Sequence, residues 1–384
     1  MGLAQVEAAR ALAPLLRAHS EDGERNRRLP ADVADALVAG GFFRMLVPAS
    51  LGGGERDPAT FVATVEELSR ADAAAGWCIA ACATSGMVAA YLDESAARDV
   101  FGDAGSVSGG VFAPRGRAQS TPGGYSVSGR WAFASGVDHC DWLMGGCFVL
   151  EHGAPAMVVE GRPDIRLVMF PADEAEVLDT WNVSGLRGTG SHDMEIHDVR
   201  VPAERTTSLL TDAPLERGPL YAFPVFGLLA LSIAGVTLGI ARAALDDIAD
   251  LAGAKTPTLS SRRLAERVAT QSGVARAEGS LRAARELLYA EIERGWAQAR
   301  LEGEVSVAQR AALRLAATHA TSASAGVVDT AYELGGGSSI YETSSLQRHF
   351  RDVHAATQHM LVGPATWELT GRVLLGLPTE TDQL

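Results

Sequence analysis

Residues 129–136 read Gly129-Arg130-Trp131-Ala132-Phe133-Ala134-Ser135-Gly136. Trp131, Phe133 and Ser135 stand at alternate positions, which is the spacing of a β-strand and places the three side chains on one face. On this pattern alone, Trp131 and Phe133 suit the core of a β-domain. Ser135 fits a strand interior poorly, because Gly136 and polar residues follow it.

Strand signals continue on both sides of this stretch. A Gly-Gly turn at 123–124 precedes it, and further strand-like runs cover residues 142–150, 156–160, 165–170 and 194–201. Short strands separated by Gly and Pro are typical of a small barrel or sandwich. We therefore predict a central β-domain over residues 102–215.

The rest of the chain has helical periodicity. Residues 1–101 predict a helical N-terminal domain, and residues 216–384 predict a C-terminal four-helix bundle with helices near 228–248, 264–299, 305–334 and 345–362. The segment 222–241 carries no charge and is long enough to span a bilayer. Its small residues and the absence of a basic flank favour a buried helix instead. The predicted fold class is α+β.

Composition excludes several classes of partner. The 384 residues carry a net charge of −14, which argues against nucleic acid and anionic membranes as partners. We expect no secretory leader and a cytoplasmic location, with the four cysteines acting as small buried hydrophobes. Cys78 and Cys82 lack neighbouring histidines, so no metal site is expected.

Two further stretches complete the pattern. They are Gly185-Leu186-Arg187-Gly188-Thr189-Gly190-Ser191-His192-Asp193, and Gly335-Gly336-Gly337 followed by Arg348-His349-Phe350-Arg351-Asp352-Val353-His354. In this order, the three stretches resemble the acyl-CoA dehydrogenase superfamily. More narrowly, they resemble the oxygenase components of its two-component (group D) flavin-dependent monooxygenases, and the resemblance covers essentially the whole chain.

The resemblance implies a cofactor site between the β-domain and the bundle. The cofactor would be FADH₂ or FMNH₂, supplied by a separate flavin reductase, with O₂ as co-substrate. Trp131, Phe133 and Ser135 would flank the isoalloxazine ring, with Ser135 near its N5 and C4a atoms. The other residues matching cofactor contacts are Arg187, Thr189, Ser191, Gly335, Gly336 and Gly337.

Each of these matches has a purely structural alternative. The loop at 185–193 could be a Gly-rich hairpin whose hydroxyl groups bond their own backbone. The triplet Gly335–Gly337 could be an ordinary helix C-cap, or it could reach the cofactor of a neighbouring subunit. The superfamily assembles as dimers of dimers, so a homotetramer formed through the bundle is expected.

The segment 351–363 separates the branches of the superfamily. Dehydrogenases carry a catalytic glutamate where this chain has Met360, and a thioether cannot accept a proton. The oxygenase branch carries a histidine that His359 matches, and an imidazole can orient or deprotonate a substrate. His354 is expected only to pack.

The sequence thus predicts a monooxygenase that uses reduced flavin to oxygenate an aromatic or polycyclic small molecule through a C4a-hydroperoxyflavin. Apolar pocket walls are expected at 77–87, 111–117 and 209–226. One alternative is an acyl-CoA dehydrogenase or oxidase with its base at Asp246, Asp247 or Asp250. The other alternative is a non-catalytic flavin-binding scaffold.

Overall fold

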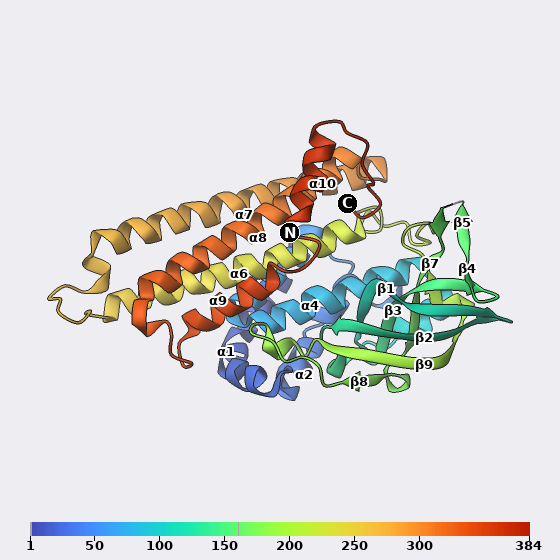
Figure 1. Ribbon diagram of the computed structural model, residues 1–384, viewed down its shortest axis with the longest axis horizontal. Helices are drawn as coiled ribbons and strands as arrows, with labels where there is room; N and C mark the ends of the chain where they lie inside the picture. The colour runs from blue at the N-terminus through green and yellow to red at the C-terminus, as the bar shows by residue number, and fades with distance from the viewer. Residues whose placement is uncertain (1, 160) are drawn as a thin grey trace.

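The computed structural model describes residues 2–159 and 161–384 (Figure 1). The last residue of the predicted strand 156–160 lies outside this described part. Helices fill the first hundred residues, a sheet follows, and long helices complete the chain. The predicted succession of helical, β and helical regions is confirmed, whereas the boundaries at 102 and 216 remain predictions.

The N-terminal region consists of short helices that pack around one another. Their bounds are α1 (Leu3–Asn26), α2 (Ala31–Ala39), α3 (Pro58–Ala71), α4 (Ala73–Ser85) and α5 (Glu94–Phe101). Aspartate side chains begin three of them by accepting a hydrogen bond from a backbone N–H in the first turn, and these are Asp57, Asp72 and Asp93.

The β-domain is one mixed sheet with an added two-stranded ribbon. The main sheet runs in the order β10-β7-β3-β1-β2-β9-β8, with β4 paired to β3. The pair β1–β3 is parallel, and the other pairs are antiparallel. The longer strands are β1 (Ser108–Thr121), β2 (Gly124–Ala134), β3 (Trp142–Glu151), β7 (Ile165–Pro171) and β9 (His192–Pro202). The short ones are β4 (Ala154–Pro155), β5 (Met157–Val159), β6 (Arg162–Pro163), β8 (Glu176–Leu178) and β10 (Thr206–Thr207).

The C-terminal region is built on α6 (Val225–Ala254), which packs against α8 (Val307–Gly335) and α9 (Ser345–Ala356), while α7 (Val268–Glu302) packs on α8. A last helix, α10 (Ala365–Leu374), crosses the end of the bundle (Figure 1). Among the described residues, two segments are apolar and long enough to cross a membrane, Ala73–Tyr91 and Val225–Ala254, and 89% of the 18-residue apolar window in each is buried inside the protein. The predicted charge-free helix is therefore a core helix, and one continuous apolar core joins it to the N-terminal helices.

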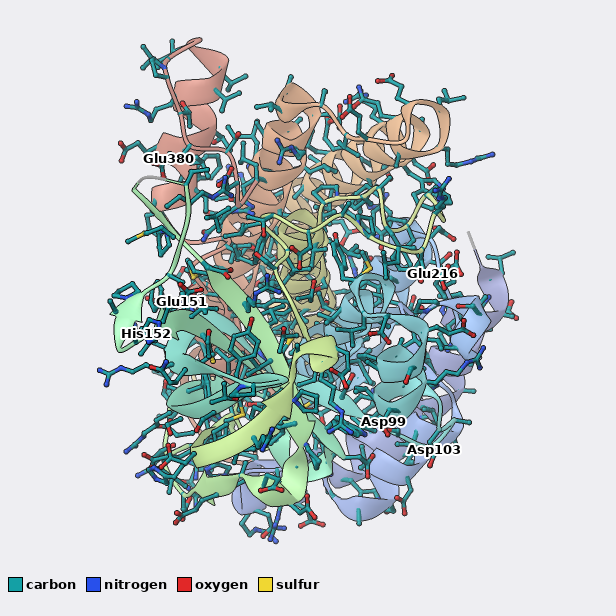
Figure 2. All side chains as sticks on the ribbon, turned by 90° about the vertical axis from the view of Figure 1, so that its right-hand side faces the viewer. Asp99, Asp103, Glu151, His152, Glu216 and Glu380 are labelled. Atoms are coloured by element: carbon teal, nitrogen blue, oxygen red, sulfur yellow. The ribbon has the colours of Figure 1, made fainter. Side chains whose placement is uncertain are left out.

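Polar contacts tie the helical region to the sheet at the end of the molecule shown in Figure 2. Asp99 of α5 forms an ion pair with Arg205, which follows β9. The buried guanidinium of Arg44 donates a hydrogen bond of 2.8 Å to the carbonyl oxygen of Asp103. The Asp99 ion pair therefore links α5 to the segment after β9, and the Arg44 bond holds the segment that leads from α5 into β1.

The alternation predicted for Trp131, Phe133 and Ser135 is wrong. The pairing of β2 with β9 shifts register between Trp131 and Ala134, and Phe133 has a φ of 66°. Such an irregularity rotates the following side chains out of the two-residue period. Trp131 is fully buried, whereas the side chain of Phe133 is 70% exposed.

The helix predicted for residues 345–362 is also shorter than expected, because α9 ends at Ala356. A hydrogen bond of 2.7 Å from the Thr357 hydroxyl to the His354 carbonyl and one of 3.2 Å from Leu361 N–H to the His359 ring close the next turn. Pro364 then disfavours helical geometry in the residue before it. His359 consequently lies in a turn between α9 and α10.

Candidate active site

Ser135 directly follows β2, at the boundary between the sheet and α4. Its side chain is 7% exposed, and its carbonyl oxygen lies 3.3 Å from the sulfur of Cys82. The chain then turns at Gly136, where φ is 72° and a Cβ atom would stand 3.0 Å from the Cys82 sulfur. The thiols of α4 therefore pack directly beneath this turn.

The loop after β8 joins Ser135 through hydroxyl groups. The Ser135 Oγ lies 2.7 Å from the Oγ of Ser191, which in turn lies 2.7 Å from the Oγ1 of Thr189. Thr189 Oγ1 donates to the carbonyl of Leu186 at 2.8 Å, and the N–H of Gly136 donates to the carbonyl of Thr189 at 2.9 Å. Strand end and loop are thus joined by side-chain and backbone hydrogen bonds.

The side chain of Trp77 connects the Ser135 hydroxyl to His359. It lies on α4, whose first turn is capped by the Asp72 carboxylate, and burial raises the pKa of Asp72 to about 6. The Trp77 indole N–H donates to Ser135 Oγ at 3.0 Å. On its other side, its ring meets that of His359 edge to face, with ring centroids 6.0 Å apart. The structure therefore brings together the two predicted catalytic residues, Ser135 and His359, on either side of a tryptophan.

His359 has a defined hydrogen-bonding state. The backbone N–H of Leu361 donates to its Nδ1 at 3.2 Å, so Nδ1 is the acceptor nitrogen. Burial, together with the charge of Arg314, lowers the pKa of His359 from 6.5 to about 4. The ring is therefore neutral near pH 7 and carries its hydrogen on Nε2, where it can donate a hydrogen bond.

An aromatic surface lies next to the hydroxyl groups. The exposed ring of Phe133 meets Trp181 edge to face at 6.0 Å, and the Trp181 indole N–H donates to the Leu186 carbonyl at 3.1 Å. An exposed aromatic ring beside buried hydroxyls matches a planar ring system with polar edge atoms, such as a flavin. The residues present therefore fit the cofactor that the sequence predicts.

Helix α9 holds the loop in place. The Asp352 carboxylate is 7% exposed and accepts a hydrogen bond of 2.6 Å from the Leu186 N–H. Burial raises the pKa of Asp352, and this hydrogen bond opposes the shift. Close packing requires Gly185, because a Cβ atom there would stand 2.0 Å from the Arg351 carbonyl oxygen. Arg351 and Asp352, which belong to one of the stretches that carry the family resemblance, thus support the loop.

The remaining predicted site residues have different surroundings. Trp131 donates its indole N–H to Gly146 at 2.8 Å within the core of the sheet, so the core interpretation is the correct one and its ring has no surface for a ligand. Arg187 borders a small cavity with Asp72 and Asp352, and its Nε is buried without a hydrogen-bond partner among the described residues. Gly335–Gly337 end α8 at the far end of the bundle from the sheet (Figure 1).

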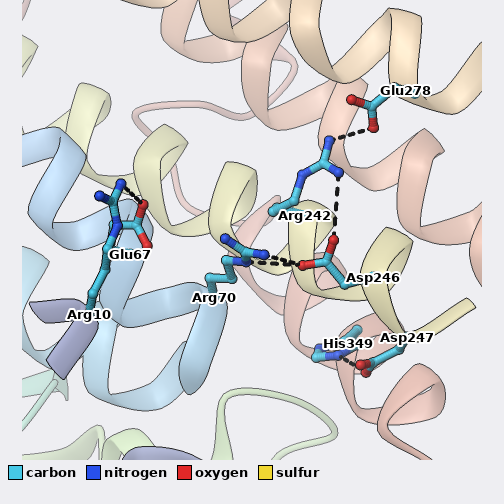
Figure 3. Close-up of polar contacts among 8 residues, drawn as sticks. All are labelled: Arg10, Glu67, Arg70, Arg242, Asp246, Asp247, Glu278 and His349. Carbon is cyan, nitrogen blue, oxygen red and sulfur yellow. Dashed lines mark hydrogen bonds and ion pairs between the residues drawn. The ribbon is translucent and has the colours of Figure 1, made fainter. Parts of the chain in front are cut away.

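Two of the three aspartates considered as alternative bases form ion pairs (Figure 3). Asp246 pairs with Arg70 at 2.6 Å, and Asp247 pairs with His349 at 2.9 Å. Burial would raise the pKa of Asp247, but the hydrogen bond and charge of His349 outweigh it and the pKa is lowered. Asp250 is exposed. Ion pairing leaves Asp246 and Asp247 poor candidates for proton abstraction.

A cavity of about 220 Å³ lies beside these ion pairs, between α3, α6 and α7. Arginine and glutamate side chains line most of it, among them Arg70, Arg242 and Glu66. Arg242 also bonds Glu278 at 2.5 Å, as Figure 3 shows. Because its charged lining side chains pair with one another, this cavity does not suit an apolar aromatic ligand. It is also separate from Ser135.

Known proteins resemble this chain over nearly its whole length. Residues 4–99 match the family "Acyl-CoA dehydrogenase, N-terminal domain", and residues 231–364 match "Acyl-CoA dehydrogenase, C-terminal domain". An indole-3-acetate monooxygenase of Pseudomonas putida is 34% identical, with 94% of this chain and 90% of that protein covered. The oxygenase component of an FADH(2)-dependent resorcinol hydroxylase from Rhizobium sp. is 30% identical, with coverage of 95% and 92%. The crystal structure of 3-HSA hydroxylase from Rhodococcus sp. RHA1 superposes with a TM-score of 0.90 at 30% identity and covers 98% of both chains.

Replacing Asp352 tests whether α9 holds the site loop. Asp352→Ala leaves the Leu186 N–H unpaired, which typically costs about 1–3 kcal/mol, and should weaken binding of reduced flavin. Asp352→Asn keeps an acceptor oxygen and serves as the matched control. Thermal unfolding and anaerobic flavin titration measure the two effects. Equal flavin affinity in the Ala and Asn variants would show that the loop does not depend on this contact.

Proposed function

The chain belongs to the acyl-CoA dehydrogenase family and is the oxygenase component of a flavin-dependent monooxygenase, and we propose how its residues carry out the reaction. Reduced flavin, when bound, supplies the electrons that activate O₂, and one oxygen atom enters an aromatic substrate. A separate flavin reductase provides the reduced cofactor. One observation carries the assignment of residues: Ser135 and His359 meet at Trp77.

We assign the cofactor to the surface formed by Phe133, Trp181 and Ser135. The exposed Phe133 ring offers an apolar wall, and the Ser135 hydroxyl offers a hydrogen bond to the polar edge of the isoalloxazine ring. Arg187 is a further proposed ligand, because its buried Nε has no partner among the described residues. Thr189 and Ser191 are buried behind Ser135 and act through it.

The substrate pocket is proposed to lie between β1 and the start of α6. Phe112 of β1 meets Phe226 of α6 edge to face, with ring centroids 6.1 Å apart. Two of the three predicted pocket walls therefore meet at an aromatic contact. Apolar walls with few charges suit an aromatic or polycyclic molecule, and indole-3-acetate and resorcinol are suitable probes because similar proteins are named for them.

Isotope incorporation tests the function. With FADH₂ generated by a flavin reductase and ¹⁸O₂ as oxidant, mass spectrometry should find one ¹⁸O atom in the product from an aromatic probe. Butyryl-CoA, mixed with the oxidised-flavin form without O₂, serves as the control and should leave the flavin oxidised. Bleaching of the flavin by butyryl-CoA would instead favour a dehydrogenase. Complete conversion of O₂ into H₂O₂ with every aromatic probe would contradict the substrate class.

His359 is proposed to donate a hydrogen bond to the substrate through Nε2 rather than to remove a proton. His359→Gln places an amide N–H near the Nε2 position without a basic nitrogen, whereas His359→Ala removes the donor. We expect Gln to keep most of the product formed per flavin oxidised and Ala to lose about tenfold or more, with flavin affinity unchanged in both. Equal losses in the two variants would assign His359 the role of a base.

Because the pKa of His359 is lowered to about 4, its imidazole stays neutral well below its ordinary value of 6.5. Its hydrogen-bonding state should therefore persist at mildly acidic pH. Only as the pH approaches 4 does Nδ1 gain a hydrogen and lose the bond from the Leu361 N–H, while Nε2 stays a donor. Coupling measured from about pH 5 to 8 should show no inflection that disappears in His359→Gln. An inflection near 6.5 that the Gln variant removes would contradict the donor role.

We further propose a homotetramer that forms through the bundle. Apolar side chains are exposed there, including Val268 and Leu301 on α7, and Ile340 and Tyr341 just after Gly335–Gly337. In such an assembly, the glycines at the far end of α8 would approach the cofactor of a neighbouring subunit. Sedimentation at the mass of one 40.2 kDa chain would exclude the assembly.

A cytoplasmic location is also proposed. Its support is that Cys78, Cys82, Cys140 and Cys147 are all free thiols. Free thiols persist in a reducing compartment, where the reductase and its electron donor are also available. Cell fractionation tests this location, and recovery of the protein outside the cytoplasmic fraction would overturn it.

A further inference from the structure

The hydroxyl groups of Ser135, Ser191 and Thr189 form a chain that ends on a backbone carbonyl. The oxygen–oxygen distances are 2.7 Å, 2.7 Å and, to the Leu186 carbonyl, 2.8 Å. The three side chains are 7%, 2% and 1% exposed. Little water reaches them, so their hydrogen bonds are decided mainly by one another.

The direction of this chain follows from its carbonyl end. A carbonyl oxygen has no hydrogen, so the hydrogen between it and Thr189 Oγ1 belongs to Thr189. A hydroxyl has only one hydrogen, so Thr189 accepts from Ser191. Ser191 uses its one hydrogen in the bond to Thr189, so it accepts a hydrogen bond from Ser135.

The other end of the chain agrees with this direction. The indole nitrogen of Trp77 is a donor only, and it lies 3.0 Å from Ser135 Oγ. Ser135 thus accepts from Trp77 and donates its single hydrogen to Ser191. The Ser135 oxygen therefore has one lone pair free to accept a further hydrogen bond, and it has no hydrogen left to donate.

We propose that Ser191 and Thr189 are positioning residues that make Ser135 a pure hydrogen-bond acceptor, and that this polarity selects reduced over oxidised flavin. The inference rests on the proposed function, which places Ser135 at the N5 edge of the flavin. Reduced flavin carries a hydrogen on N5 and can donate to Ser135. Oxidised flavin presents a lone pair at N5, and two acceptors facing each other leave both without a partner.

This assignment changes the role of two predicted cofactor ligands. The hydroxyl hydrogens of Thr189 and Ser191 are both used within the chain, so these residues influence the flavin through Ser135. An oxygenase component that takes reduced flavin from a reductase and leaves oxidised flavin to be recycled benefits from such a difference. Selectivity then arises from hydrogen-bond direction rather than from shape.

Direct binding measurements test the inference without turnover. The dissociation constants of FADH₂, under anaerobic conditions, and of FAD are measured by fluorescence titration of the purified protein. Ser191→Ala removes the group that accepts the Ser135 hydrogen, and Thr189→Val frees Ser191 to donate back to Ser135. In either variant Ser135 can donate to N5 of FAD. We expect the ratio of the FAD constant to the FADH₂ constant to fall by roughly tenfold, mainly through tighter FAD binding.

Two controls separate the possible failures. Thr64→Val removes a buried hydroxyl of α3 that bonds the Thr60 carbonyl at 2.8 Å, and it should leave the ratio within about twofold of wild type. Ser135→Ala should weaken FADH₂ binding. When Ser191→Ala is added to Ser135→Ala, the ratio of the two dissociation constants should not change further. Circular dichroism and the unfolding midpoint establish that each variant folds.

The outcomes are distinguishable. An unchanged ratio in both Ser191→Ala and Thr189→Val, with a clear effect of Ser135→Ala, would overturn the inference and leave Ser135 at the cofactor. No effect of Ser135→Ala on either constant would remove Ser135 from the cofactor site, and the inference would fall with that assignment. A reduced ratio in both chain variants, absent in Thr64→Val, supports the proposal.

Discussion

The hydrogen bond between the hydroxyls of Ser135 and Ser191 joins two parts of the protein that are 56 residues apart in sequence. Around this link, the end of β2, the loop at 185–191 and helix α4 meet. Each group in the link has a single hydrogen to give, so the arrangement tolerates little rearrangement. The cofactor surface, the orientation of Trp77 and the approach to His359 all depend on it.

The surrounding helices keep that link in place. Asp72 caps α4 and so positions Trp77, while Asp352 of α9 accepts from the Leu186 N–H. Asp352 is buried and Asp72 is partly buried, and burial raises the pKa of each. A buried polar group without a partner is costly, so these contacts define one arrangement of the loop relative to the helices.

Much of the fold could be predicted from the sequence because its signals are local. Apolar periodicity located the long helices, and the charge-free segment 222–241 was correctly interpreted as a core helix. Where local conformation breaks the period, prediction failed. The bulge at Phe133 separates it from Trp131, and the turn after Ala356 takes His359 off the helix. Trp77 and Trp181 carried no distinctive sequence signal, because a single aromatic residue in a helix or loop usually packs in a core.

The sequence by itself determined the order of the domains, the absence of the dehydrogenase glutamate at Met360 and the candidacy of Ser135 and His359. The order of the domains follows from periodicity within short windows, and the other two follow from the resemblance to the superfamily. Only the tertiary structure decided that Trp131 supports the sheet, that Asp246 and Asp247 are ion-paired, and in which direction the hydroxyl chain donates. Hydrogen-bond direction depends on which partner lies at each end, and those partners come from segments that only folding brings together.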